Sequence, residues 1–143
     1  PSGREALPSM SSTSVTVKFA PMSSRPCAFN SSTAFGVRKC SKAMELILMG
    51  LGGCASFDIV TILKKSRQDV TNVVCQLKAD RADTIPAVFT KIHLHFVVSG
   101  RAVKEKQVAK AVELSAEKYC SASKMLSDGG VIISHDFEII EVE

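Results

Sequence analysis

The apolar run from Met44 to Leu63 constrains the fold of this chain more than any other feature of its sequence. The run is long enough to cross a lipid bilayer as a helix. It also contains Glu45, Asp58 and three glycines, however, and ionisable side chains are costly inside a membrane. We therefore expect no membrane span. We expect instead a long helix over residues 42–66 that a single domain buries on nearly all sides.

Alternating apolar and polar residues predict strands before and after the long helix. The clearest is "VFTKIHLHFVVSG", in which Ile92, Leu94 and Phe96 fall on one face. Apolar residues at spacings of three and four predict an amphipathic helix over residues 103–119, followed by a helical turn that ends at Gly129. The pattern indicates an α+β fold with an antiparallel sheet around the long apolar helix. Strands are expected at residues 14–19, 33–38, 72–79, 88–100 and 131–143.

The charged residues of this chain are unevenly distributed. All of the net charge of +4 comes from residues 1–41, which are rich in serine, while the remainder is neutral. We expect residues 1–14 to form a flexible tail and residues 15–143 to form one domain. A basic, serine-rich start is typical of an organellar transit peptide, but a tag remnant or an ordinary flexible end has the same composition. A neutral domain with few aromatic residues is not expected to bind nucleic acid.

The five cysteines do not form the pattern of a disulfide scaffold. Their number is odd, and no two are arranged as C-x-x-C. Individually placed thiols of this kind are typical of a reducing compartment. Together with the lack of a signal-peptide pattern, this favours a cytoplasmic protein. In the strand over residues 72–79, Cys75 shares a face with Val73 and Leu77, so we expect it in the core.

His93 and His95 fall on the face of the clearest strand that is opposite its apolar residues. Two histidines side by side could ligate a metal ion. No acid or cysteine close to them in the sequence completes a ligand set, however. A solvated strand face is therefore the favoured interpretation, and no metal site is expected there.

Cys54 and Cys120 occupy unusual positions. Cys54 follows Gly52 and Gly53, although each glycine costs a helix about 1 kcal/mol relative to alanine. The glycines would let a substrate approach the thiol, or let another backbone pack closely beside an inert buried cysteine. Cys120 lies at the start of a helical stretch with lysines nearby, where a thiolate can be stabilised, although a core cysteine fits the same residues. The local sequence does not show whether the two thiols meet.

An apolar helix that contains "GGC", followed about 65 residues later by "EKYC", resembles the family of osmotically inducible protein C and organic hydroperoxide resistance proteins. The likeness covers residues 43–143 and is closest to an uncharacterised bacterial branch that carries "LSAEKYCS". It implies an OsmC-like fold and an intertwined homodimer. It also implies a thiol peroxidase that needs neither a metal nor a flavin cofactor.

The resemblance implies a role for each of the two thiols. Cys54 would attack the O–O bond of an organic hydroperoxide and become a sulfenic acid. Cys120 would then form a disulfide with Cys54, and a small-molecule or lipoyl-type dithiol would reduce that disulfide. The substrate pocket is expected to be apolar, with contacts from Leu51, Phe57 and Met125.

The family also uses a glutamate in a Pro-x-Glu segment that opens the helix, and an arginine from the N-terminal region. Here the segment reads "KAME", so Glu45 is the candidate glutamate, although on a straight helix it would point away from Cys54. Arg25 and Arg38 are the candidate arginines. Asp58 lies one turn after Cys54, and a carboxylate there disfavours a thiolate. These departures leave a second function open, that of a non-catalytic redox sensor or a binding protein for small apolar ligands.

Overall fold

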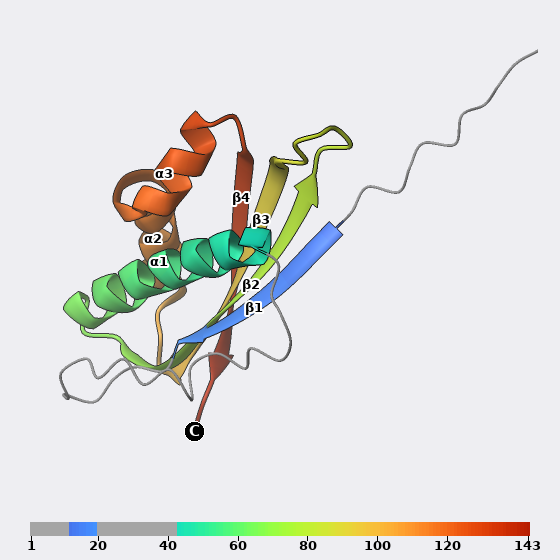
Figure 1. Ribbon diagram of the computed structural model, residues 1–143. Coiled ribbons are helices and arrows are strands. Elements are labelled where there is room, and N and C mark those ends of the chain that lie inside the picture. Colours follow the sequence, from blue (N-terminus) through green and yellow to red (C-terminus); the bar gives the residue numbers. More distant parts are fainter. Residues whose placement is uncertain (1–11, 20–42) are drawn as a thin grey trace, which may run out of the picture.

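The computed structural model describes residues 12–19 and 43–143, and these form a sheet with helices packed on one face (Figure 1). The predicted strand over 33–38 and the candidate residues Arg25 and Arg38 lie outside the described residues. The elements are β1 (Ser12–Phe19), α1 (Ala43–Lys65), β2 (Asp69–Arg81), β3 (Phe89–Arg101), α2 (Glu105–Leu114), the π-helical segment η1 (Ser115–Tyr119), α3 (Ser121–Asp128) and β4 (Ile132–Glu141).

The described elements agree closely with the α+β prediction. The long helix, predicted over residues 42–66, is α1, and the strand predicted over residues 72–79 is the centre of the longer β2. Cys75 on β2 is 0% exposed, which confirms that it is a core residue. The main difference in boundaries lies at the start, because β1 begins at Ser12, within the range predicted to be tail.

The sheet has the strand order β1-β2-β3-β4, and it is mixed rather than wholly antiparallel. Strands β1, β2 and β3 form antiparallel pairs, as predicted, whereas β4 pairs with β3 in parallel. The prediction of an antiparallel sheet is therefore wrong for the last strand. The physical reason is the crossover: α2, η1 and α3 carry the chain back along the sheet, and a chain that returns in this way starts its next strand in the same direction.

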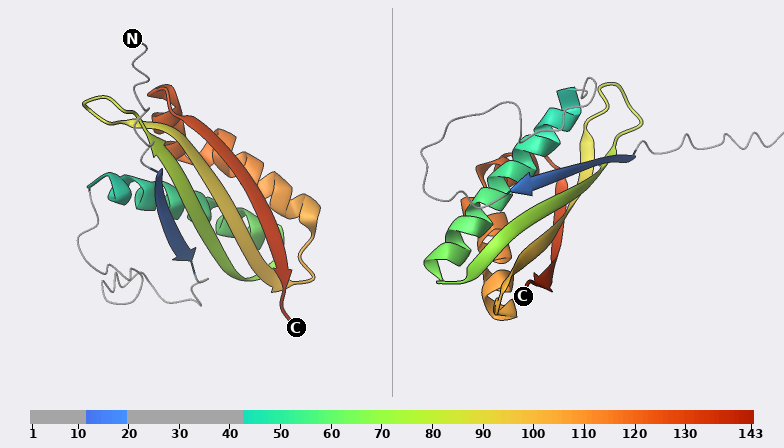
Figure 2. Two further views of the ribbon diagram at one scale, coloured as in Figure 1. Left: turned by 90° about the vertical axis from the view of Figure 1, so that its right-hand side faces the viewer. Right: turned by 90° about the horizontal axis from the view of Figure 1, so that it is seen from below.

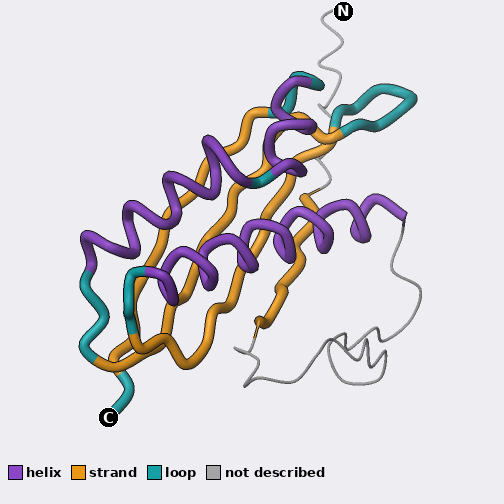
Figure 3. The backbone as a smooth tube through the Cα atoms, turned by 90° about the vertical axis from the view of Figure 1, so that its left-hand side faces the viewer, coloured by secondary structure: helices purple, strands orange, loops and turns teal. Residues whose placement is uncertain are grey.

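The helices cover one face of the sheet, and the opposite face is left uncovered by the described residues (Figures 2 and 3). Helix α1 directs a row of apolar side chains toward the sheet, each 0% exposed: Leu48, Leu51, Ile59 and Leu63. The outward side of α1 is also apolar, but Leu46 and Phe57 are 56% and 59% exposed. The expectation that α1 is buried on nearly all sides is therefore wrong. Among the described residues, the sheet covers the inner side of α1, and the other helical segments cover only one flank.

Two adjacent glycines of α1 lie on these two different sides. A Cβ atom added to Gly52 would lie 2.7 Å from Cδ1 of Leu77 and 3.1 Å from Cγ2 of Val17. Gly52 therefore lets α1 approach β1 and β2 closely. A Cβ added to Gly53 or Gly50 would meet no described atom within 4 Å, so these two glycines leave the outward side of α1 open.

Helix α1 also has the length and mean hydropathy of a membrane-spanning helix, and among the described helices it is the one that does. In the folded chain 44% of that apolar window is buried within the domain. The fold therefore buries one side of this helix, while Leu46 and Phe57 on its other side remain exposed.

Candidate active site

Three side chains with reactive or ionisable groups meet where η1 and α3 pack beside α1. The sulfur atoms of Cys54 and Cys120 and a carboxylate oxygen of Asp58 all lie within 4.8 Å of one another. Cys54 and Asp58 come from the same face of α1, one turn apart. Cys120 comes from the junction between η1 and α3, and both thiols are reduced. The structure thus brings together two cysteines that lie far apart in the sequence.

The π-helical segment η1 places Cys120 beside α1. The hydroxyl of Ser115, the first residue of η1, donates a hydrogen bond to the carbonyl oxygen of Ala55 on α1 (3.3 Å). The backbone N–H of Cys120 donates to the carbonyl of Ser115 (2.9 Å), which closes the wide turn. A continuous helix was predicted up to Tyr119, but a π turn occupies its end, and such turns are common at functional sites.

Cys120 caps the N-terminus of α3 and is 2% exposed. Burial raises the pKa of its thiol, the hydrogen bond from the backbone N–H of Ser123 (3.4 Å) opposes this, and the neighbouring Cys54 raises the pKa further. The net effect is a raised pKa, so Cys120 is a neutral thiol at neutral pH. The expectation that nearby lysines would stabilise a thiolate is wrong, because Lys124 forms an ion pair with Asp128 and Lys118 lies over the ring of Tyr119.

Asp58 is the least satisfied side chain of this site. Its Oδ2 atom is buried and has no hydrogen-bond partner among the described residues. Burial raises the pKa of its carboxyl group above the ordinary value. A buried acceptor without a partner is costly, and where one persists it often serves a functional purpose.

Two surface grooves border the cluster and meet at Tyr119. One, of about 380 Å³, is lined by Asp58 together with Ile62, Leu114 and Lys65. The other, of about 520 Å³, is lined by Cys120 and Met125. The groove walls thus combine apolar and charged side chains, and they reach Asp58 in one groove and Cys120 in the other.

The remaining candidate residues from the sequence differ in how far they are buried, and Glu45 lies far from this cluster along α1. Leu51 is 0% exposed and packs in the core, whereas Phe57 and Met125 are 59% and 72% exposed. Glu45 lies in the first turn of α1, nine residues before Cys54, which corresponds to about 13.5 Å along a helix axis. The carboxylate beside the thiols is therefore Asp58, which sequence reasoning treated as a departure from the family pattern.

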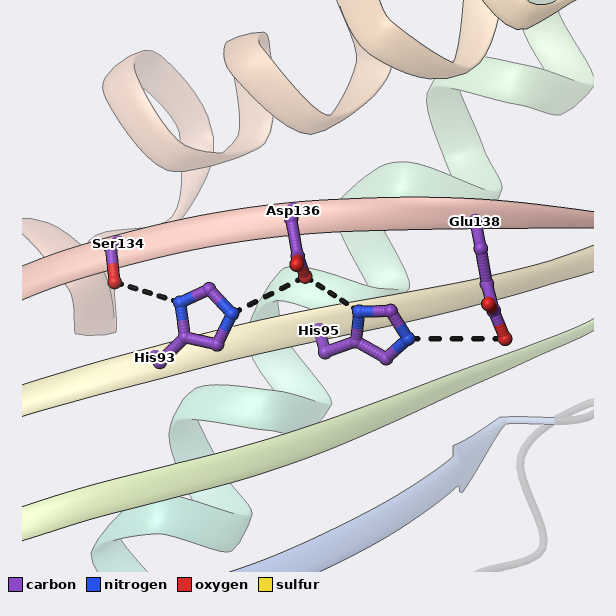
Figure 4. A network of polar contacts seen from close by, with 5 residues as sticks. All are labelled: His93, His95, Ser134, Asp136 and Glu138. Carbon is purple, nitrogen blue, oxygen red and sulfur yellow. Dashed lines mark hydrogen bonds and ion pairs between the residues drawn. The ribbon is translucent and has the colours of Figure 1, made fainter.

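A second polar cluster lies on the uncovered face of the sheet (Figure 4). Nδ1 of His95 is 2.6 Å from Oδ1 of Asp136, and Nε2 of His93 is 3.3 Å from the same oxygen. The other nitrogen of each histidine faces β4 as well, with Ser134 at 2.8 Å from His93 and Glu138 at 3.9 Å from His95. Slight burial would raise the pKa of Asp136, but the two histidines outweigh it and the pKa is lowered.

The sequence correctly predicted that His93 and His95 share a polar face, but it missed their acidic partners. The parallel register of β3 and β4 places His95 opposite Asp136. The available signal was the alternation of polar residues at Ser134, Asp136 and Glu138 along the last strand. All of these side chains remain partly or largely exposed, which agrees with a solvated strand face.

Comparisons with known proteins identify relatives of the chain. Residues 38–136 match the family model described as OsmC-like protein. The protein YhfA of Escherichia coli K12 is 47% identical over 102 residues, which cover 71% of this chain and 75% of YhfA. A solved structure of a hypothetical protein from Aquifex aeolicus VF5 is 34% identical, with a TM-score of 0.69, and the match covers 74% of this chain and 79% of that one.

The fold also resembles that of the organic hydroperoxide resistance protein OhrB of Bacillus subtilis. The TM-score is 0.50 at 16% identity, and the match covers 71% of this chain and 73% of OhrB. At this identity the likeness concerns the fold alone.

Proposed function

Because the chain belongs to the OsmC-like protein family, we propose that it is a two-cysteine thiol peroxidase that reduces organic hydroperoxides. The observation that supports this most directly is the meeting of Cys54 and Cys120 within 4.8 Å. A cycle of disulfide formation and reduction requires two free thiols that can reach each other. Cys54 and Cys120 come from separate elements and lie close enough for side-chain rotation to join them.

The difference in exposure between the two thiols supports a different role for each in this proposal. Cys54 is half-buried, so a peroxide can reach it, whereas Cys120 is 2% exposed and neutral. In the first step the thiolate of Cys54 attacks the outer oxygen of the hydroperoxide ROOH. The O–O bond breaks, Cys54 becomes a sulfenic acid, and the leaving alkoxide takes up a proton to give the alcohol ROH.

The second step uses the neutral thiol of Cys120. Its sulfur attacks the sulfur of the sulfenic acid at Cys54, a disulfide forms, and the hydroxyl group leaves with the thiol proton as water. A small-molecule or lipoyl-type dithiol then reduces the disulfide by exchange and is itself oxidised to a disulfide. Sulfur supplies both electrons, so the cycle needs no metal or flavin.

The grooves beside the site favour an organic substrate over hydrogen peroxide. Ile62, Leu114 and Tyr119 line the groove that reaches Asp58, and Met125 lies beside Cys120. These side chains offer apolar contact to an alkyl or aryl group, which hydrogen peroxide lacks.

We also propose that an arginine of the N-terminal region, Arg25 or Arg38, supports the reaction by neutralising Asp58. The carboxylate of Asp58 would otherwise disfavour the thiolate of Cys54. In this proposal Asp58 replaces Glu45 as the acidic partner, because it lies beside the thiols. Arg38→Ala and Arg25→Ala should each be tested for slower oxidation of Cys54, and the variant that slows it identifies the arginine. If neither variant slows the oxidation, this part of the proposal fails.

The outward side of α1 supports a homodimer. Leu46, Gly50, Gly53 and Phe57 follow one another at helical spacing, and the glycines leave room for a second helix to approach. Two copies of α1 packed along this stripe would bury the exposed apolar side chains. Light scattering after gel filtration should give twice the chain mass for the natural protein and the chain mass for Gly53→Leu. A natural protein that is monomeric at high concentration would contradict the dimer.

The experiment that tests the proposed function treats the reduced protein with one equivalent of cumene hydroperoxide, blocks free thiols by alkylation, and maps the peptides by mass. We expect a rapid disulfide between Cys54 and Cys120 that is absent from Cys54→Ser. Cys75→Ala is the matched control, because Cys75 is 0% exposed and burial raises the pKa of its thiol to about 12. The proposal fails if Cys54 remains reduced or oxidises without joining Cys120.

A second function, that of a redox sensor or an apolar-ligand protein, is favoured by one observation. Among the described residues, no basic side chain pairs with Asp58, and its carboxylate lies beside the thiols. Such a site would react slowly with peroxide. The rate constants for oxidation of Cys54 by peroxide and for turnover with a dithiol separate the two functions. A sensor needs the oxidation but no rapid turnover.

A further inference from the structure

We propose that Cys54, Asp58 and Cys120 form a binding site for a zinc ion when the two thiols are reduced. The donor atoms of these residues lie within 4.8 Å of one another. In a tetrahedral zinc site the sulfur atoms lie about 2.3 Å from the metal and therefore about 3.8 Å from each other. The three residues thus need to close by about 1 Å at most, which side-chain rotation can supply.

The donor types fit zinc. Two thiolates and one carboxylate form a borderline-soft set, and soft thiolate ligands select zinc over magnesium or calcium. Cys54 and Asp58 share one face of α1 at positions i and i+4, the spacing with which helical zinc motifs present two ligands to one ion. Cys120 supplies the third ligand from a different element, which fixes the ion between the helices.

One further observation points to a ligand at this place, and a second shows that the sulfur of Cys120 is already held in position. The Oδ2 atom of Asp58 is buried and without a hydrogen-bond partner among the described residues, and a cation would satisfy it. The sulfur of Cys120 already accepts a hydrogen bond from the backbone N–H of Ser123 (3.4 Å). Hydrogen bonds of this kind orient a metal-bound thiolate from outside the ligand set.

Three protein ligands leave the fourth position of a tetrahedral zinc ion for water or another small ligand. Binding releases the protons of the two thiols, so affinity should fall as the pH is lowered. Zinc bound to both sulfur atoms would also block their reaction with a hydroperoxide, a consequence that rests on the proposed function. Zinc binding itself needs only the reduced thiols.

The test is a titration of the full-length, reduced protein with zinc in competition with a chromophoric chelator, without any peroxide. We expect one zinc ion per chain. The change of a residue outside the ligand set already weakens metal sites by 10–100-fold, so loss of a ligand in Cys54→Ser or Asp58→Asn should weaken binding by about 100-fold or more. Cys75→Ala and Glu113→Gln are the matched controls, since one is a core thiol and the other an exposed acid, and both should bind as the natural protein does.

Cobalt provides a second readout, because cobalt bound by thiolates gives a charge-transfer absorption that cobalt bound only by oxygen and nitrogen lacks. That absorption should fall to about half per bound cobalt in Cys54→Ser, which keeps one thiolate of two, and should keep its full intensity per bound cobalt in Asp58→Asn, which binds more weakly. The proposal is overturned if the reduced protein binds no zinc, or if Cys54→Ser binds zinc as tightly as the natural chain. Zinc binding without any peroxide reaction would instead contradict the proposed function and leave the zinc site in place.

Discussion

The two polar clusters of this protein lie on opposite faces of the same sheet. Each contains an aspartate, but only one of the two aspartates has ionisable partners among the described residues. On the face that the helices cover, Asp58 has no cationic partner among the described residues, and burial raises the pKa of its carboxyl group. On the open face, Asp136 lies between two histidines, and its pKa is lowered. The difference shows that an unsatisfied, partly buried group is available for chemistry, whereas a paired and solvated group is already satisfied.

The largest expected difference between the clusters concerns turnover. Cys120→Ser should lose most of the continuous reduction of cumene hydroperoxide by a dithiol, because no protein thiol then lies beside the sulfenic acid at Cys54, and excess peroxide competes with the dithiol and converts it to sulfinic acid. His95→Ala, on the open face, should retain turnover. The measurement is dithiol consumption over time, with the mass of the oxidised protein as a check. Loss of turnover in His95→Ala would break the contrast between the two faces.

The next effect concerns stability. Ile59→Ala removes a side chain of α1 that is 0% exposed and faces the sheet, and loss of such a core side chain costs about 2–5 kcal/mol in the free energy of unfolding. His93→Ala, in the exposed cluster, should cost less than about 1 kcal/mol. Urea denaturation of both variants measures this difference. Equal losses would show that the open face contributes to stability as much as the core does.

A smaller effect is expected on thiol reactivity. In Asp58→Asn the negative charge beside Cys54 is removed, and about 1.4 kcal/mol less repulsion corresponds to a tenfold change. We therefore expect iodoacetamide to alkylate Cys54 about ten times faster at neutral pH, with Glu113→Gln as the control that leaves the rate unchanged. Asp58→Asn removes one negative charge near Cys54 whether or not an arginine also lies there, so an unchanged rate would contradict electrostatic coupling between these two side chains.

The smallest effect concerns the pH dependence of stability on the open face. Because the folded pKa of Asp136 lies below its ordinary value of 3.8, its carboxylate stabilises the fold above that pH, and this contribution is lost as the pH falls through the lower folded pKa. Asp136→Asn should therefore reduce stability slightly near neutral pH and not in strong acid. NMR titration of Asp136 and urea denaturation at both pH values measure this, and a folded pKa above 3.8 would contradict it.

The sequence predicted the elements well because their signals are local. Period-two alternation located β2 and β3, and apolar density located α1. The direction of β4 was missed because it depends on where the crossover helices return the chain, which no local pattern encodes. The outward side of α1 was also missed, since hydropathy does not distinguish an apolar side chain that faces the sheet from one that faces away.

The candidate site was predictable in part. The motifs pointed to Cys54 and Cys120, but their proximity depends on how η1 and α3 pack against α1. The sequence predicted that Asp58 lies one turn from Cys54 on the same face of the helix, but it did not show that the carboxylate is buried without a partner among the described residues.

The π turn at η1 makes the spacing of the site a matter of residue count as well as residue type. A π turn contains one residue more than an α turn, so deletion of one residue from Ser115–Tyr119 should restore a regular helix. Each residue of an α-helix advances the direction of a side chain by about 100°. The wide turn takes up its extra residue within one turn and keeps Cys120 beside α1, whereas the same residues wound as a regular α-helix would rotate the Cys120 side chain by about 100°.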